Sequence, residues 1–389
     1  MTLNPILFLR SRSLAGMNHN GTGVGGDGDG DAYEGAWSEV IRPVLAQILL
    51  FVLFLGLAAQ IDVKTFKSKF TEKKKRRGVF AGVFCQFIVM PLLGLASVKI
   101  FDVDPVTGSV LLLITSSPGG ALSNWVCALF NADLALSIAL TTASSVCAFF
   151  MMPINAVLYI DRAYPHVDVP IEWTGAAIAL AVVIVGVFLG MYLGTKHPLR
   201  RLFFHKLATV AGLLSIILSL VTSNAGPEAV PLWERDSTFF ASISFVVFSG
   251  LAVGIVVSVA LDLPGPQRMA VAIETMYQNL GIAVSASLTM FSSDRDTAIA
   301  SGVPIFYGVL GSATNLSFCL ICWKVLGWSL APSSDGLCEV LLKSYQPKTD
   351  APRSLHRNNS SVNNVVPSAE DGNGGGIELA AAENAAALQ

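Results

Sequence analysis

The stretch SSPGGALSNW, residues 116–125, interrupts one of the most hydrophobic parts of this chain. Pro118 lacks a backbone N–H and clashes with the preceding helical turn, and Gly119 and Gly120 are poor helix formers. Inside a bilayer, the backbone groups freed by such a break must be satisfied by protein or by water. The stretch therefore predicts a deliberate break in a membrane helix, with the polar side chains of Ser123 and Asn124 placed directly after it.

The composition around this stretch is that of a membrane protein. Of the 389 residues, 53% are hydrophobic and 13% are charged, whereas a soluble protein carries about 25% charged residues. Apolar stretches recur from about residue 39 to residue 328, with lengths near the ~20 residues that cross a bilayer. We therefore expect an all-α polytopic membrane protein that lies in a lipid bilayer. The net charge of −2 indicates no nucleic-acid partner.

Turn and charge signals divide the apolar region into nine predicted transmembrane helices. Their ranges are 39–60, 78–100, 107–130, 134–159, 173–194, 205–223, 238–261, 267–291 and 303–328. This gives a transmembrane transporter domain at 38–328, preceded by a disordered extracellular tail at 1–37. A disordered cytoplasmic tail is predicted at 329–389, because that segment has few large apolar residues.

The basic residues predict the orientation. Eight Lys and Arg residues fall in the first loop, at 64–77, and four more fall between residues 196 and 206. Short loops rich in Lys and Arg stay in the cytoplasm, so an odd number of spans places the N-terminus outside and the C-terminus inside. Asn20 begins an Asn-Gly-Thr glycosylation sequon, which is usable only on the outer side. We expect a multi-pass protein of the plasma membrane.

Polar side chains recur deep inside the predicted spans. Glu274 is the one carboxylate well inside any of them, and such a group is costly in lipid and marks function by default. Gln278 follows it by one helical turn, and Gly281 makes local unwinding plausible. Ser137 and Thr141 line one face of another span, where small hydroxyl residues also serve close helix packing.

These carboxylate, amide and hydroxyl groups are all hard oxygen donors, which suit alkali cations and not transition metals. Two interrupted helices, one in each half of a transporter, are the best sequence indication of a binding site at the midplane. Ser123 has no histidine base in any span and Glu274 has no partner carboxylate, so the sequence does not indicate an enzyme. No resident cofactor is expected; sodium ions would be a co-substrate.

Three motifs in unbroken order resemble the sodium/bile acid symporter family. They are SSPGGALSNW with the following ADLALSIALTTASSVCAFFMMP, the earlier GVFAGVFCQFIVMP, and the later AIETMYQNLGIAV. The resemblance covers roughly residues 45–328. It implies an inverted-repeat transporter with a core domain and a panel domain, two crossing broken helices, two sodium sites at the crossing and an organic-anion cavity between the domains.

Carried over by motif position, the resemblance implies specific ligands. The first sodium site would be formed by Ser123, Asn124, Ser137, Thr141 and Glu274. The second would be formed by Gln86, Glu274, Thr275, Tyr277 and Gln278, with Thr275 and Tyr277 acting through backbone carbonyls. Asn279 would face the substrate cavity, and Glu274 would couple the two ions.

Two departures from the family pattern stand out. Ser116 and Ser117 replace a frequent Cys pair and are expected to serve helix packing. Met276 and Tyr277 replace the usual Gly-Met, and a tyrosine there would reshape the cavity, so bile salt and steroid sulfate both stay open as substrate. A proton-coupled transporter and a non-transporting receptor or orphan of the same fold also stay open.

Overall fold

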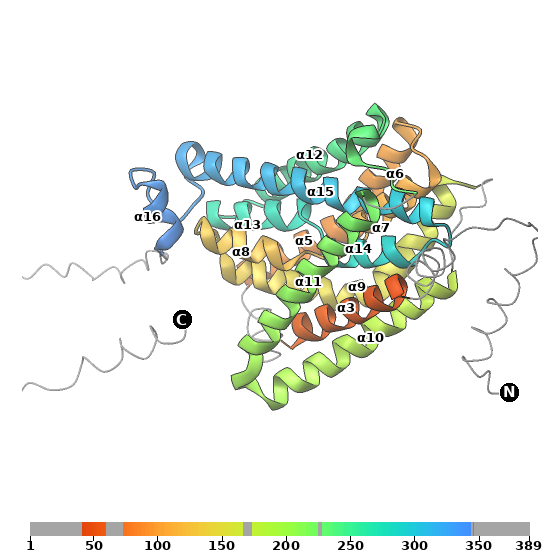
Figure 1. Ribbon diagram of the computed structural model, residues 1–389. Coiled ribbons are helices and arrows are strands. Elements are labelled where there is room, and N and C mark those ends of the chain that lie inside the picture. The colour runs from red at the N-terminus through yellow and green to blue at the C-terminus, as the bar shows by residue number, and fades with distance from the viewer. Residues whose placement is uncertain (1–40, 60–72, 166–172, 225–227, 344, 346–389) are drawn as a thin grey trace, which may run out of the picture. The chain divides into compact units, whose positions relative to one another are not determined.

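The computed structural model describes residues 41–59, 73–165, 173–224, 228–343 and 345. These residues form helices and short connections and contain no β-strand; one isolated bridge joins Gly119 to Gln278. The helices of one half are α3 (Arg42–Ala58), α5 (Lys73–Phe84), the π-helical turn η2 (Cys85–Val89), α6 (Met90–Ile100), α7 (Pro105–Thr115), α8 (Ala121–Leu129) and α9 (Leu134–Ala163). The others are α10 (Trp173–Lys196), α11 (Arg201–Asn224), α12 (Ser237–Ala260), α13 (Gly265–Met276), α14 (Leu280–Thr289), α15 (Asp294–Ile321), the π-helical turn η5 (Cys322–Leu326) and α16 (Leu337–Leu342); short 3₁₀ turns complete the chain (Figure 1).

Several of these helices are long and apolar enough to cross a membrane, so the chain is a multi-pass membrane protein. Within the described residues four qualify alone: Arg76–Ile100, Lys206–Asn224, Ser237–Ala260 and Asp294–Leu326. The bent pair Leu134–Ala148 and Phe150–Ala163 makes a fifth. Helical residues lie within each of the nine predicted ranges, but the number of nine crossings stays a prediction. The last range begins too late, because α15 starts at Asp294 and not at residue 303.

Helix α9 is bent by 64° between Ala148 and Phe150. Its cause is Pro153, which lies inside the helix. A proline cannot donate to the carbonyl four residues earlier, and its ring pushes that carbonyl away. That carbonyl belongs to residue 149, which lies at the bend. The bend divides α9 into two arms that can contact different partners.

Two helical pairs, α7 with α8 and α13 with α14, are interrupted in the middle and meet at their interruptions. The backbone bridge between Gly119 and Gln278 connects the two breaks. The Asn279 N–H donates to the carbonyl of Pro118 at 2.9 Å. Backbone groups left unpaired by one break are thus satisfied by the other, as burial in an apolar environment requires. The sequence predicts both breaks.

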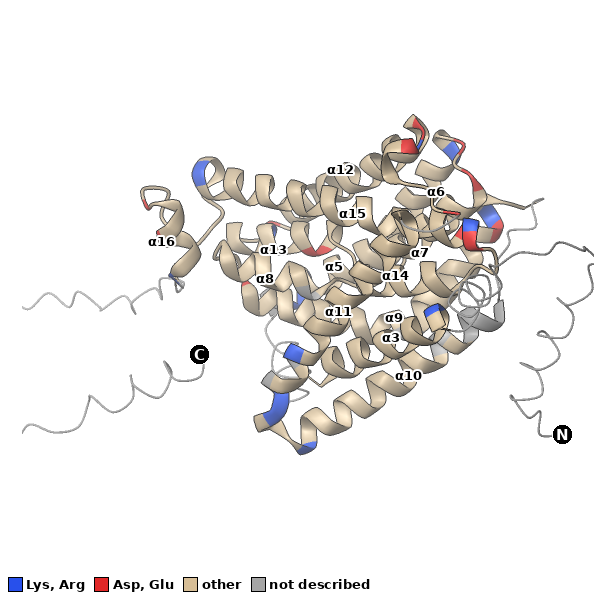
Figure 2. Cartoon of the chain, in the orientation of Figure 1, with Lys and Arg blue, Asp and Glu red and all other residues tan. Residues whose placement is uncertain are grey.

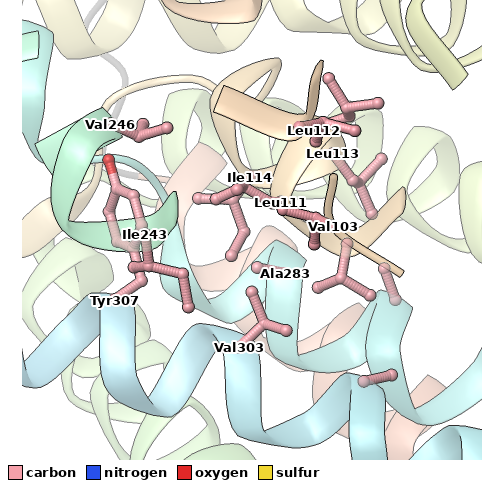
Figure 3. Close-up of a cluster of buried hydrophobic side chains, with 14 of the residues drawn as sticks. Val103, Leu111, Leu112, Leu113, Ile114, Ile243, Val246, Ala283, Val303 and Tyr307 are labelled. Carbon is pink, nitrogen blue, oxygen red and sulfur yellow. The ribbon is translucent and has the colours of Figure 1, made fainter. Parts of the chain in front are cut away.

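The largest apolar cluster of the described residues packs around α7, the first half of one broken helix, and α14, the second half of the other. Leu111–Ile114 of α7 converge with Ile243 and Val246 of α12, Ala283 of α14, and Val303 and Tyr307 of α15 (Figure 3). Each of these side chains is buried. Such dense packing holds the ends of the broken helices in place, since cores of this kind deform little.

Helices α3, α10 and α11 form a second group, in which α3 packs between the other two. Glycines permit the close approach: a Cβ atom on Gly56 would lie 2.4 Å from the Phe204 carbonyl oxygen, and one on Gly190 would lie 2.3 Å from that of Leu55. The group contacts the remainder through α14 and α15. Arg42 at the start of α3 pairs with Asp294 at the start of α15 at 2.9 Å. The division into core and panel domains stays a prediction.

Among the described residues, most charged residues lie near the helix ends, while the middle parts of the helices consist mostly of uncharged residues (Figure 2). Lys196, Arg200 and Arg201 lie at the junction of α10 and α11, which the sequence assigns to the cytoplasm. That assignment stays a prediction, as does glycosylation of Asn20, which lies outside the described residues.

The helical part of the chain continues past the predicted domain boundary at residue 328. Helix α16 follows, and Trp323 packs with Ala331 and Val340. Asn131, in the turn between α8 and α9, donates from Nδ2 to the Val340 carbonyl at 3.0 Å. Residues of the 329–343 segment therefore contact the helical domain, and the domain boundary at residue 328 stays a prediction.

Candidate ion and substrate site

The Glu274 side chain lies at the crossing of the two broken helices, on the last turn of α13. It is fully buried, with 0% of its surface exposed. Three hydroxyl groups contact its carboxylate: Ser123 at 2.8 Å and Ser137 at 2.5 Å from Oε1, and Thr141 at 3.0 Å from Oε2. Ser123 comes from α8, and the other two come from α9. The structure therefore brings together residues predicted from three separate helices.

Asn124 joins the same group from the first turn of α8. Its Oδ1 lies 2.7 Å from the Ser137 hydroxyl and 3.3 Å from the Thr141 hydroxyl. The five residues predicted for a first sodium site thus form one contiguous cluster. Their role as ion ligands stays a prediction.

This cluster contains more oxygen acceptors than its hydroxyl protons can serve. The Ser123 hydroxyl lies within bonding distance of Glu274 Oε1 and of the Gly120 carbonyl at 2.5 Å. Ser137 has Glu274 and Asn124 as acceptors, and Thr141 has both of these and the Ser137 carbonyl. Each hydroxyl has a single proton. The excess of oxygen lone pairs favours a bound cation.

No positively charged side chain balances Glu274 within the described part of the chain. The ion pairs found there involve Arg42, Arg268, Arg295 and Lys343, and their acidic partners are other residues. A buried, uncompensated carboxylate costs several kcal/mol. No group of three or more His, Cys, Asp or Glu residues suited to a metal ion occurs in the described ranges. The chemistry of the cluster is that of hydroxyl, amide and carboxylate oxygens.

A second group of oxygens lies near the Glu274 backbone carbonyl. The Gln86 amide donates from Nε2 to the Glu274 carbonyl at 2.9 Å, and the Gln278 amide donates to the Thr275 carbonyl at 2.8 Å. The Oε1 atoms of both glutamines are buried without a partner, as is the Thr275 hydroxyl. Unpaired buried acceptors are rare and point to an unseen partner. These residues belong to the predicted second sodium site.

Tyr277 contributes its backbone to the second break, but its side chain points toward α15. The ring packs beside Gly311, and the hydroxyl lies 3.1 Å from the Ser312 hydroxyl. The expectation that this tyrosine reshapes the cavity finds no support, because Tyr277 is absent from the described residues that line it. Met276 and Tyr277 instead attach the break to α15 through Tyr307 and Ser312.

Gly119 provides the space in which the two broken helices meet. A Cβ atom at this position would lie 2.5 Å from Glu274 Oε2 and 2.7 Å from Gln86 Nε2. Both distances are far below van der Waals contact. At Gly120 the nearest atom, the Gln278 carbonyl oxygen, would lie 3.1 Å away. Only Gly119 is therefore in direct steric conflict with the cluster.

A cavity of about 370 Å³ adjoins the cluster. Its polar wall includes Asn124, Thr141 and Asn279, and its apolar wall includes Phe54 of α3 and Val187 of α10. Asn279 also caps α14, accepting from the Ile282 N–H at 3.3 Å. Thr141 contacts Glu274, Asn124 contacts Thr141, and both residues also line the cavity, so the cavity and the cluster share side chains.

Three contacts at the crossing are not predicted from the sequence. The Ser117 hydroxyl, expected to serve only helix packing, accepts from the Asn279 N–H at 3.2 Å. The Ser144 hydroxyl accepts from the Gly119 N–H at 3.3 Å. The Tyr307 hydroxyl donates to the Met276 carbonyl at 2.7 Å, where α13 ends. Ser144 continues the Ser137–Thr141 stripe by helical spacing, whereas nothing in the sequence indicates Tyr307.

Comparisons with known proteins show which family this chain resembles. The model of the Sodium Bile acid symporter family matches residues 47–226, which include α7, α8 and α9. Over these residues the chain is similar to the sodium/bile acid symporter family. This is a family of transporters and not of enzymes.

Relatives within the family match a longer part of the chain. The human ileal sodium/bile acid cotransporter is 26% identical over 282 residues, which cover 71% of this chain and 78% of the relative. The human sodium-dependent organic anion transporter is 25% identical over 273 residues, which cover 70% of each chain. The human hepatic sodium/bile acid cotransporter is 27% identical over 244 residues, which cover 62% of this chain and 69% of the relative.

Proposed function

We propose that this protein is a sodium-coupled symporter that imports an organic anion. The observation that carries the proposal is the acceptor-rich cluster around Glu274, a fully buried carboxylate whose contacts are neutral hydroxyl groups. A sodium ion would supply the missing positive charge and accept the unused lone pairs. The names of the relatives support sodium as the coupled ion.

We assign the first sodium ion to Ser123, Asn124, Ser137, Thr141 and Glu274. The second ion would bind between the Gln86 and Gln278 amide oxygens, which are buried without partners, with the Thr275 and Tyr277 carbonyls. Glu274 belongs to both groups and would couple them. Sodium is the transported co-substrate in this scheme, and the chain needs no resident cofactor.

The cavity beside the cluster is where the anion would bind. Its lining combines apolar side chains with the Asn124, Thr141 and Asn279 side chains and includes no Lys, Arg or His among the described residues. Such a cavity suits an amphipathic molecule with an apolar body, like a bile salt or a steroid sulfate. The positive charge that attracts the anion would come from the bound sodium.

Transport would follow alternating access. Sodium entering from outside would order the crossing and complete the cavity, because Asn124 and Thr141 face both. Movement of α3, α10 and α11 against the remaining helices would then open the cavity to the cytoplasm. A potential of ~100 mV contributes ~2.3 kcal/mol for each net positive charge carried inward. This scheme places the protein in the plasma membrane with its N-terminus outside.

The test is an uptake assay in cells that express the chain. Bile salts, steroid sulfates and small carboxylates are offered with external sodium or with choline, and sodium-dependent accumulation is expected for at least one of them. Uptake that does not depend on sodium but increases when the external medium is acidified would indicate that protons, and not sodium ions, are the coupled ion. Binding without accumulation would indicate a receptor. Sodium-dependent thermal stabilisation of the purified protein tests ion binding without knowledge of the substrate.

A further inference from the structure

The helix that carries Gln86 changes its hydrogen-bond register at that residue. Along the π-helical turn η2, the Met90 N–H bonds to the Cys85 carbonyl, five residues earlier. Pro91 follows directly. In an α-helix the carbonyl of residue 87 pairs with the N–H of residue 91, and a proline has none. In place of that α-helical donor, the Phe87 carbonyl bonds to a donor from another helix.

Asn155 is that donor. Its Nδ2 atom donates to the Phe87 carbonyl at 2.9 Å, and its side chain is buried. The residue lies on the second arm of α9, two positions after Pro153. The first arm of the same helix carries Ser137 and Thr141, which contact the Glu274 carboxylate. The bend in α9 thus allows one helix to reach both sides of the crossing.

The carbonyl that Asn155 holds belongs to the residue next to Gln86. Gln86 is fully buried, its Nε2 donates to the Glu274 carbonyl, and its Oε1 has no partner. The direction of that oxygen depends on the π-helical register, because a return to α-helical bonding rotates the following residues against the preceding ones. π-helical turns of this kind are frequent at functional sites.

We infer that Asn155 is a positioning residue for sodium coupling: it holds the π-helical turn in the register that aims the Gln86 amide oxygen at the second break. The inference rests on the proposed sodium-coupled function. Asn155 contacts Phe87 and not the Glu274 cluster, so it acts on sodium through Gln86 and is not itself assigned as a ligand.

The first experiment replaces Asn155 by leucine, which has a similar size and no donor. Loss of a buried hydrogen bond that leaves a carbonyl unpaired is expected to raise the half-saturating sodium concentration for uptake by about five- to tenfold. The Hill coefficient for sodium should fall toward one, while the substrate concentration for half-maximal uptake at saturating sodium stays unchanged. Ile154→Ala, on the adjacent lipid-facing position, is the matched control and should leave the sodium dependence as it is.

The second experiment tests the cause. Pro91→Ala restores an N–H that can pair with the Phe87 carbonyl, so Asn155→Leu should have a smaller effect in the Pro91→Ala background than in the native one. Equal effects in the two backgrounds would overturn the inference, because they would show that Asn155 and the gap at residue 91 are not coupled. Asn155→Ser, which keeps a shorter donor, should give an intermediate sodium dependence and serves if the leucine variant does not reach the membrane.

The outcomes separate this inference from the function on which it rests. If the native protein shows neither sodium-dependent uptake nor sodium-dependent thermal stabilisation, the proposed function fails. If the native protein responds to sodium and Asn155→Leu responds equally at normal surface abundance, the role of Asn155 fails alone. A parallel loss of sodium and substrate affinity would also contradict it, since that result indicates general damage to the fold.

Discussion

Between α7 and α8 the chain carries Pro118, Gly119 and Gly120, whereas between α13 and α14 it carries Tyr277, Gln278 and Asn279. The first break is written into the local sequence, because these residues cannot continue a helix. The second contains neither proline nor glycine. It is held open by long-range contacts: Tyr307 donates to the Met276 carbonyl, and the Asn279 N–H bonds to Pro118.

The two breaks also contribute different things to the crossing. The first provides space, since a Cβ atom on Gly119 would collide with Glu274 and Gln86. The second provides the negative charge, since Glu274 lies on the last turn of α13, directly before that break. Neither break forms the cluster alone. Substitutions that act on space, on charge and on the long-range contacts should therefore have separable effects.

The largest expected effect comes from the charge. Glu274→Gln keeps the size of the side chain but removes the carboxylate that would balance sodium, and loss of one partner of a buried ion pair costs roughly 3–5 kcal/mol. We expect sodium-dependent uptake to fall at least about 100-fold at physiological sodium. The measurement is initial uptake rate against sodium concentration, normalised to surface abundance. Glu339→Gln, in α16, is the control, and full activity of Glu274→Gln would refute the site assignment.

A smaller but still large effect comes from the space. Gly119→Ala forces an atom between Glu274 and Gln86, and overpacking of this kind costs about 1–3 kcal/mol. We expect a roughly tenfold rise in the half-saturating sodium concentration for Gly119→Ala and at most about a twofold rise for Gly120→Ala. Sodium titration of uptake compares the two neighbours directly. If both alanines behave alike, the role of Gly119 as the provider of space is wrong.

The long-range contacts should affect stability more than coupling. Tyr307→Phe leaves the Met276 carbonyl without its donor and is expected to lower the free energy of unfolding by about 1–2 kcal/mol. Denaturation of the purified protein in mixed micelles measures this change. Tyr192→Phe removes a hydroxyl exposed on α10 and should have no effect. An equally stable Tyr307→Phe protein would mean that the second break holds itself open.

This difference between the breaks explains what the sequence can predict. Pro118, Gly119 and Gly120 identify the first break without any partner, and hydrophobic length identifies the helices. The carboxylate of Glu274 and its neighbouring amides are conspicuous because polar groups are costly in lipid. The grouping of Ser123, Ser137 and Glu274 is predicted only through the resemblance to a family. No local sequence pattern indicates that residues so far apart in the chain lie together.

Other features depend on packing that no local pattern encodes. Gly281 made unwinding plausible, but it lies inside α14, where a Cβ atom would lie 2.2 Å from a methyl group of Leu53 in α3. This glycine permits α14 to pack closely against α3. Tyr277 was expected near the cavity and points to Ser312 instead. A side chain at the interruption of a helix can point to either side, and its contacts with the neighbouring helix determine which side it takes.

The smallest effect concerns Ser117, where the two breaks share a hydrogen bond. Its hydroxyl donates to the Ile114 carbonyl at 2.8 Å and accepts from the Asn279 N–H at 3.2 Å. That N–H also donates to the Pro118 carbonyl at 2.9 Å, so Ser117→Ala leaves it satisfied. We therefore expect at most about a twofold change in the sodium titration, because a redundant hydrogen bond contributes well under 1 kcal/mol. A change as large as that of Gly119→Ala would mean that Ser117, and not the backbone bridge, joins the two broken helices.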